Sequence, residues 1–397
     1  MKIGILYYVS STAAATIADD TNYPWLNTLA EKTGYEFSVT DIDHIDEYDM
    51  ILNFIGGGGT EGLFLEKLPS LPQPIFLLTT GANNSLAASM EILSYLNHHE
   101  IPGEIIHGSD DFVIERIQKL ACVFSAKKRL EGFRFARVGK PSDWLISSEV
   151  DASQMKEFTG IELIDISMEE FMEEIAKNSY EENEYIRMIK EREFNRDELE
   201  KAFYIYGALR RLVDRYQLDG LTVRCFDLLD TVHSTGCAGL AILNSEGIYA
   251  SCEGDVPALL SMAVLGELTK QPVFMANPSR IDSEKNEIIF AHCTLPISMP
   301  KDFSIMTHFE SQIGVAFRGK ISEGPITVFK TDGYLFDYFV SSGVLLENLT
   351  EYNLCRTQIK LHLDESVSYF LNDSIGNHHL IIQGDYSDII DEFFRWN

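Results

Sequence analysis

The N-terminal part of the chain alternates short apolar runs with stretches whose apolar positions recur at helical spacing. The apolar runs predict buried strands, and the stretches between them predict helices. This alternation is the pattern of a doubly wound parallel sheet. The predicted strands span residues 2–8, 35–40, 50–55 and 74–80, and the predicted helices span residues 23–32 and 86–98.

A second α/β pattern follows the basic, turn-forming segment at residues 127–132. Apolar runs at residues 134–138, 162–166 and 221–226 predict strands. The long charged stretch at residues 169–216 is poor in Gly and Pro, so it predicts two or three helices that cover the sheet.

After Pro300 the pattern changes to short alternating strands joined by turns that carry Gly and Asp, which predicts a small antiparallel barrel or sandwich. These strands are expected at residues 305–309, 313–317, 326–330, 338–345, 357–361 and 379–383, with a turn at 318–320 and a final amphipathic helix at 387–396. The predicted fold class is therefore α/β, with two doubly wound, Rossmann-like domains followed by a β-barrel-like domain. The predicted domains span residues 1–130, 131–300 and 301–397.

The composition narrows the choice of partners. The chain of 397 residues has 61 acidic and 32 basic side chains, a formal net charge of −29. Nucleic-acid binding needs clustered Lys and Arg, so no nucleic-acid partner is expected. No apolar run reaches the roughly 18 residues needed to span a bilayer, so no membrane partner is expected. The six cysteines form no CxxC pair, which predicts reduced thiols and a cytoplasmic protein.

The candidate chemistry lies where predicted strands end. Glu253 and Asp255 follow the run at 247–251, Asn277 follows the run at 272–276, and His292 follows the run at 288–291. Open α/β sheets build their sites at the carboxyl ends of strands. A carboxylate, an amide and an imidazole that meet there indicate a divalent-metal or acid–base site. Asp255 also has a structural interpretation, because with Pro257 it forms an N-cap and first-turn proline.

Several other residues allow two interpretations. The Gly56–Gly59 run lacks a nucleotide-binding fingerprint, so it is either a flexible turn or a loop that faces substrate. Trp144 either stacks on a ligand or packs between domains. Arg280 either binds an anionic group of a substrate or belongs to the solvated surface. Cys252 and Cys293 flank the candidate site, but neither has a local base, which argues against thiol nucleophile catalysis.

The order of these motifs resembles the L-fucose isomerase family and the related L-arabinose isomerases. The resemblance covers most of the chain. Its motifs are Thr60-Glu61 after the glycine run, Asn84-Ser85-Leu86-Ala87-Ala88, Pro141-Ser142-Asp143-Trp144, Cys252-Glu253-Gly254-Asp255, the polar strand end at Asn277, and Asn377-His378. It implies two α/β domains followed by a barrel-like domain. It also implies a cytoplasmic homo-oligomer, a trimer or hexamer, with active sites between subunits.

The resemblance also implies a set of metal ligands. Fucose isomerases bind Mn²⁺ through a Glu, an Asp and a His, and the Glu and Asp form the acid–base pair. Glu253 resembles the Glu and His378 the His, with His379 the alternative if the register shifts by one. Asn277 stands where the family has Asp, and His292 resembles an additional His of the arabinose enzymes. An Asn supplies a carbonyl oxygen to a hard cation but cannot carry a proton.

These observations predict a sugar isomerase that interconverts an aldose and a ketose through a metal-bound ene-diol. The expected cofactor is a divalent metal, with Mn²⁺ favoured over Mg²⁺ or Co²⁺. Glu253 and Asp255 are the expected catalytic residues. The expected metal ligands are Glu253, Asn277, His292 and His378, and the expected substrate-binding residues are Asn377, Trp144 and Arg280. The alternatives are a non-catalytic sugar-binding or regulatory protein on the same scaffold, and another metal-assisted reaction on a sugar derivative.

Overall fold

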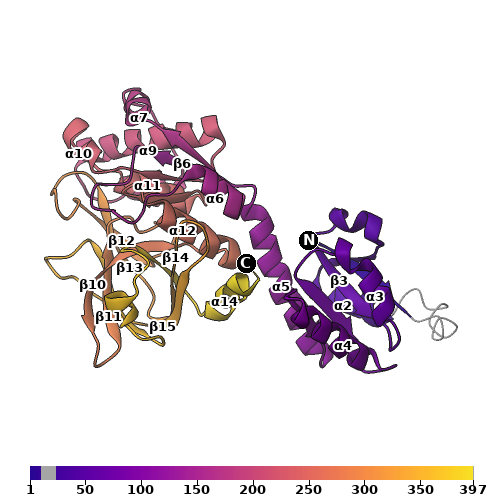
Figure 1. Cartoon of the computed structure of the whole chain (residues 1–397). Helices are drawn as coiled ribbons and strands as arrows, with labels where there is room; N and C mark the ends of the chain where they lie inside the picture. The colour runs from indigo at the N-terminus through magenta and orange to yellow at the C-terminus, as the bar shows by residue number, and fades with distance from the viewer. Residues whose placement is uncertain (10–23, 397) are drawn as a thin grey trace. The chain divides into compact units, whose positions relative to one another are not determined.

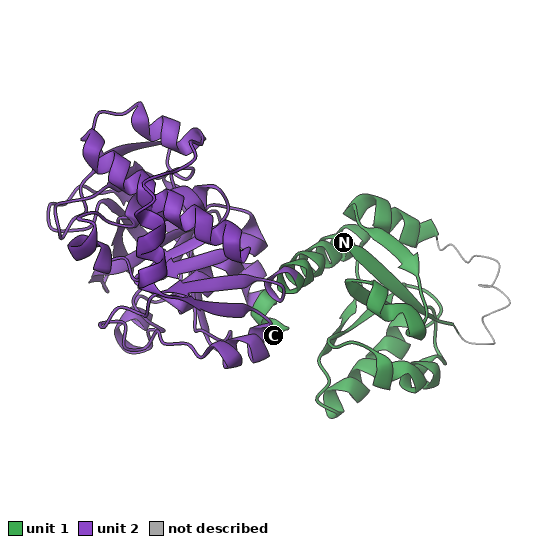
Figure 2. Ribbon diagram, turned by 90° about the horizontal axis from the view of Figure 1, so that it is seen from above, with its two compact units in different colours: residues 1–128, 392–397 green, residues 129–391 purple. Residues whose placement is uncertain are grey.

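A computed structural model describes residues 1–9 and 24–396 of the chain. The chain divides into two compact units, which Figure 2 colours separately. One unit consists of residues 1–128 and 392–397, and the other of residues 129–391. The expected helix at residues 23–32 is present as α2, Pro24–Thr33, and Tyr23 lies outside the described residues. The division into three domains stays a prediction.

The first unit contains a parallel sheet of five strands in the order β2-β1-β3-β4-β5. This sheet confirms the doubly wound pattern, and the fifth strand is an addition to the four that were predicted. Both faces of the sheet are covered, so its central strands are continuous apolar runs, as expected of buried parallel strands. The strands are β1 Lys2–Tyr8, β2 Glu36–Val39, β3 Met50–Ile55, β4 Ile75–Thr79 and β5 Gly103–Ile106, and the helices include α3 Glu61–Lys67, α4 Ser85–His98 and α5 Asp110–Leu130.

The second unit begins with a parallel sheet of four strands in the order β7-β6-β8-β9. The predicted charged helical stretch forms three helices, α7, α8 and α9. The strands are β6 Arg134–Val138, β7 Glu162–Ile166, β8 Gly220–Val223 and β9 Tyr249–Cys252. The helices are α6 Ala152–Thr159, α7 Met168–Ile175, α8 Glu184–Lys190, α9 Arg196–Tyr216, α10 Asp227–Thr231, α11 Cys237–Ser245 and α12 Val256–Thr269.

A closed antiparallel barrel completes the second unit, with strand order β10-β11-β16-β15-β14-β17. Its strands are β10 Phe274–Asp282, β11 Glu287–His292, β14 Gly324–Thr331, β15 Tyr338–Asn348, β16 Thr357–Leu363 and β17 His379–Gln383. β12 Asp302–Met306 and β13 Ala316–Lys320 form a separate two-stranded sheet. The prediction of a turn at 318–320 is wrong, because these residues are the last three of β13. The remaining helices are α13 Tyr369–Asn372 and α14 Ser387–Arg395.

The barrel corrects one expectation about the site. Asn277 and His292 do not end parallel strands of an α/β sheet. They belong to β10 and β11, which pair antiparallel inside the barrel. The sequence pattern misled because a short buried apolar run has the same appearance in a parallel strand and in a barrel strand.

Helix α12 lies between the parallel sheet and the barrel. It packs against β8 and β9 on one side and against β14 and β17 on the other (Figure 1). A helix that is apolar on all sides is usually buried, and nearly every residue of α12 is buried. Among the described residues, no helix is both long and apolar enough to cross a membrane.

Candidate active site

A tight turn after β9 presents Glu253. The turn places both Glu253, with φ of +64°, and Gly254, with φ of +74°, in the left-handed region. A Cβ at Gly254 would lie 2.5 Å from the carbonyl oxygen of Lys140, so only glycine lets the turn pack against this neighbouring loop. The backbone N–H of Ser142 donates to the carbonyl oxygen of Glu253 at 2.8 Å. The non-glycine residue Glu253 therefore sits in a costly conformation, which is common at functional sites.

The carboxylate of Glu253 contacts two polar side chains. Trp144 Nε1 donates to Oε2 at 2.6 Å, and His378 Nε2 lies 3.5 Å from Oε1. Burial opposes ionisation of this carboxyl group, but His378 and the hydrogen bond from Trp144 outweigh that effect and lower its pKa. Glu253 is therefore ionised at neutral pH, which suits both a metal ligand and a general base.

Asp255 does two jobs at the start of α12. Its Oδ1 accepts a hydrogen bond from the backbone N–H of Ala258 at 2.8 Å, which confirms the predicted N-cap. Its Oδ2 lies 2.8 Å from Nδ1 of His378. Burial opposes ionisation, but the nearby Lys330 ammonium and His378 outweigh it and lower the pKa of Asp255 to about 2. Asp255 therefore both starts the helix and orients an imidazole.

His378 is the histidine that faces Glu253. Its side chain is fully buried, and its Nε2 has no hydrogen-bond partner among the described residues. Burial disfavours its charged form, but Asp255 and Glu253 outweigh burial and raise its pKa to about 9. The next residue, His379, instead contacts Tyr369, whose Oη lies 3.2 Å from its Nε2. A buried nitrogen with no hydrogen bond is rare in proteins and needs an explanation.

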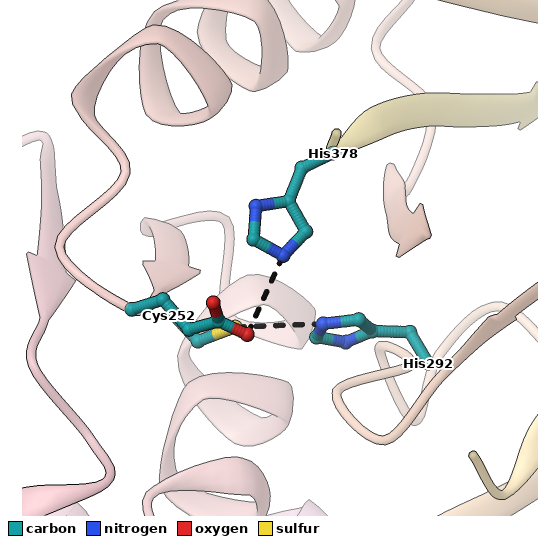
Figure 3. Close-up of side chains that lie close together, drawn as sticks. Cys252, His292 and His378 are labelled. Carbon is teal, nitrogen blue, oxygen red and sulfur yellow. Dashed lines mark hydrogen bonds and ion pairs between the residues drawn. The ribbon is translucent and has the colours of Figure 1, made fainter. Parts of the chain in front are cut away.

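His292 approaches from the end of β11. Its Nε2 lies 3.5 Å from Cys252 Sγ, and its Nδ1 lies 2.7 Å from Thr294 Oγ1. Its ring and the ring of His378 are 5.5 Å apart at an angle of 81° (Figure 3). Burial, together with the charge of His378, lowers the pKa of His292 to about 3. His292 is therefore neutral at physiological pH, the form in which imidazole binds metals.

The register of the barrel explains why these residues meet. Ala276 of β10 pairs with His379 of β17, and Asn277 pairs with Ala291 of β11. The beginning of β10, the end of β11 and the beginning of β17 therefore lie at one rim of the barrel. That rim carries Asn277 and both histidines, and it faces the turn with Glu253.

Four donor atoms form a compact group at this rim. They come from Cys252, Glu253, His292 and His378, and all lie within 4.8 Å of one another. A carboxylate oxygen, a sulfur and two imidazole nitrogens, one of them the His378 Nε2 that makes no hydrogen bond, fit a divalent metal ion. A hydrogen bond with Cys225, together with burial, raises the pKa of the Cys252 thiol, which favours the neutral thiol in the metal-free protein.

A cavity of about 510 Å³ opens beside this group. It is lined by Trp144, Phe226, Glu253, Asn277, Pro278, Glu310 and Asn377. Asn377 Nδ2 donates to Asn277 Oδ1 at 3.1 Å, so the two amides act as one polar patch. The structure thus brings together Trp144, Glu253, Asn277 and Asn377, while Asp255 is buried behind His378.

Arg280 lies elsewhere. Its guanidinium forms a two-pronged ion pair with Glu351, at 2.9 and 2.7 Å, and lines a separate groove on the barrel. Sequence reasoning missed Phe226, Glu310 and Lys330. Phe226 ends a predicted strand and Lys330 ends another, so their positions carried a signal. Glu310 lies in the loop between β12 and β13, and its position in the sequence carried no such signal.

No protein-family model matches the chain. Curated proteins with sequences similar to the chain do exist. The chain is 22% identical over 331 residues to the sulfoquinovose isomerase of Priestia aryabhattai, a match that covers 79% of this chain and 74% of the relative. The sulfoquinovose isomerase of Priestia megaterium gives the same figures. That of a Clostridium species is 28% identical over 195 residues, which covers 46% of this chain and 43% of the relative. The chain that carries this site is therefore similar to sugar isomerases.

Proposed function

We propose that the chain is an aldose–ketose isomerase that moves a proton between C1 and C2 of a sugar. The similarity to sulfoquinovose isomerases supports the reaction class. The observation that carries the proposal is the carboxylate of Glu253, which lines the cavity and belongs to a buried group of metal-type donor atoms. The identity of the sugar is left to experiment.

Four residues that line the cavity have a role in this proposal. Glu253 takes the proton from one carbon of the open-chain sugar, because it is ionised and lines the cavity, and a second acid–base group or solvent returns a proton to the next carbon. The amides of Asn277 and Asn377 bind sugar hydroxyl groups. The indole of Trp144, whose ring centroid lies 4.9 Å from that of Phe226 in a T-shaped arrangement, packs against the apolar face of the sugar. Asp255 keeps His378 oriented and does not touch the substrate.

The donor group would hold a divalent metal, with Mn²⁺ favoured. Glu253, His292 and His378 would be the ligands, and the carbonyl oxygen of Asn277 is a fourth donor that a hard cation accepts. Such an ion, when bound, polarises sugar oxygens and lowers the cost of the negative charge that forms on them as the ene-diol develops. Because Asn277 cannot carry a proton, Glu253 must work with a second acid–base group or with solvent.

The rival proposal is a sugar-binding protein without catalysis. Its support is Asn277, an amide in the position where the resembling family has a carboxylate. A third proposal keeps the metal but changes the reaction on a sugar derivative. The three differ in whether solvent deuterium enters the sugar and in which product forms.

The test is proton exchange followed by NMR. The protein is stripped of metal, supplied with Mg²⁺ to avoid paramagnetic broadening or with Mn²⁺ followed by chelation, and incubated in D₂O with aldoses and ketoses that include sulfoquinovose. We expect metal-dependent deuterium at C1 or C2 of one sugar and formation of its keto or aldo isomer. Glu253→Gln should lose this exchange, while Glu347→Gln, a partly exposed carboxylate on β15, should keep it. Sugar binding without exchange would favour the rival.

A further inference from the structure

Lys330 is a charged side chain in the interior of the second unit. It lies near the end of β14 and is only 1% exposed. An ammonium group that leaves water loses its hydration, and an opposite charge nearby offsets that cost. Its Nζ lies 3.9 Å from Oδ1 of Asp255, which is also 1% exposed. The two buried charges therefore face each other directly behind the candidate active site.

The two oxygens of Asp255 are divided between different partners. Oδ1 faces Lys330 and accepts the capping hydrogen bond from Ala258, whereas Oδ2 faces Nδ1 of His378. This division fixes the plane of the carboxylate, because each oxygen is engaged on its own side. With Nδ1 of His378 bound to Oδ2, its other ring nitrogen must point away from Asp255, toward Glu253.

Lys330 also lies under the loop that carries His378. Gly376 has φ of +131°, and a Cβ there would lie 3.6 Å from Cε and 4.0 Å from Nζ of Lys330. The loop therefore passes over the end of the lysine side chain two residues before His378. The end of the lysine side chain therefore lies close both to the Asp255 carboxylate and to the loop that carries His378.

We propose that Lys330 is a positioning residue for the active site, which holds the carboxylate of Asp255 in place so that Nε2 of His378 faces Glu253. This role rests on the proposed function, since its purpose is to present His378 to the metal and the sugar. Lys330 touches neither of them. Lys330 acts through Asp255. A lysine that only fills space would not depend on Asp255 in this way.

Lys330→Met tests the proposal, because it keeps most of the buried stem and removes the charge. In the metal-free protein, ¹⁵N-edited NMR of the His378 ring should show a protected Nδ1–H that is lost or broadened in Lys330→Met. Binding of Mn²⁺, followed by its relaxation effect on water, should weaken about tenfold or more, the scale expected for groups that support a metal ligand. Lys330→Gln provides the same comparison if the methionine variant does not fold.

A double-mutant cycle with Asp255→Asn decides the route. If Lys330 acts through Asp255, Lys330→Met should weaken Mn²⁺ binding in the wild-type background and have little further effect in the Asp255→Asn background. Equal losses in both backgrounds, or an unchanged His378 Nδ1–H signal, would overturn the proposal. The NMR comparison needs neither metal nor sugar, so it judges Lys330 even if wild-type protein catalyses no exchange and the proposed function fails.

Discussion

Trp144 Nε1 donates a 2.6 Å hydrogen bond to Oε2 of Glu253, although Trp144 as a residue is 54% exposed. The indole therefore both donates a hydrogen bond to the carboxylate and lines the cavity. A donor to the ionised form stabilises that form, so the hydrogen bond contributes to the lowered pKa of Glu253.

Trp144→Phe should shift the acidic limb of the kcat/KM profile to higher pH. The variant keeps an aromatic ring but loses the N–H donor, so the pKa of Glu253 rises and the base is protonated at a higher pH. We expect a shift of about one to two pH units, since hydrogen bonds to charged groups contribute roughly 1.5 to 3 kcal/mol. Phe226→Leu, which changes the ring packed against Trp144 but not the donor, is the control. An acidic limb that moves equally in both variants would argue against the hydrogen bond.

Asp255→Asn and Asp255→Ala should separate the two jobs of this residue. Asn is a good N-cap, so the Asn variant keeps the cap, but it leaves the buried Lys330 without its opposite charge and should lose about 3 to 5 kcal/mol in the free energy of unfolding. It should also bind Mn²⁺ about 10 to 100 times more weakly. The Ala variant should show the same loss of affinity and a further loss of about 1 kcal/mol in the free energy of unfolding. Titration with Mn²⁺ and denaturant unfolding measure the two effects. Full metal affinity in the Asn variant would contradict the orienting role.

Metal removal should lower the apparent thermal stability of the protein. A ligand that binds only the folded state adds about 2.7 kcal/mol at a free concentration about 100 times its Kd. We expect Mn²⁺ to raise the Tm of metal-stripped protein and Glu253→Gln to abolish that rise. Glu347→Gln should respond as wild type does. A Tm that ignores Mn²⁺ in wild-type protein would count against the metal site independently of any activity assay.

Glu174→Gln should remove a pH-dependent part of the stability. Glu174 is 3% exposed, and its carboxylate binds Arg211, Arg215 and Lys177. Burial opposes ionisation, but these cations lower its pKa from 4.5 to about 2. A depressed carboxyl pKa stabilises the fold above the unfolded value and loses that effect as pH falls from 4.5 toward 2.

The variant should therefore be about 1 to 2 kcal/mol less stable than wild type at pH 7, with a difference that shrinks below pH 4.5. Urea unfolding at several pH values measures it. Glu173→Gln, which changes the exposed neighbour on α7, serves as the control. A difference that stays constant down to pH 3 would exclude this origin.

The sequence predicted two α/β units followed by an antiparallel barrel or sandwich, because buried strands and amphipathic helices leave periodic apolar patterns. It also predicted the N-cap at Asp255 from local chemistry alone. It could not show that β10 and β11 belong to the barrel, since strand pairing depends on partners far along the chain. The contacts of His378 with Glu253 and of Lys330 with Asp255 could not be predicted either, because they also join residues far apart in the sequence. Single residues such as Glu310 lie in turns whose course only tertiary packing determines.

Glu253 comes from the parallel sheet, whereas His292 and His378 come from the barrel, with α12 packed between the two layers. An ion held by all three would link the parallel sheet to the barrel across the seam, which is the interface between them. Its binding affinity would then report how firmly the layers are clamped together, and a variant that loosens α12 would release the metal before the chain unfolds. A metal bound there would therefore support the scaffold as well as the proposed chemistry.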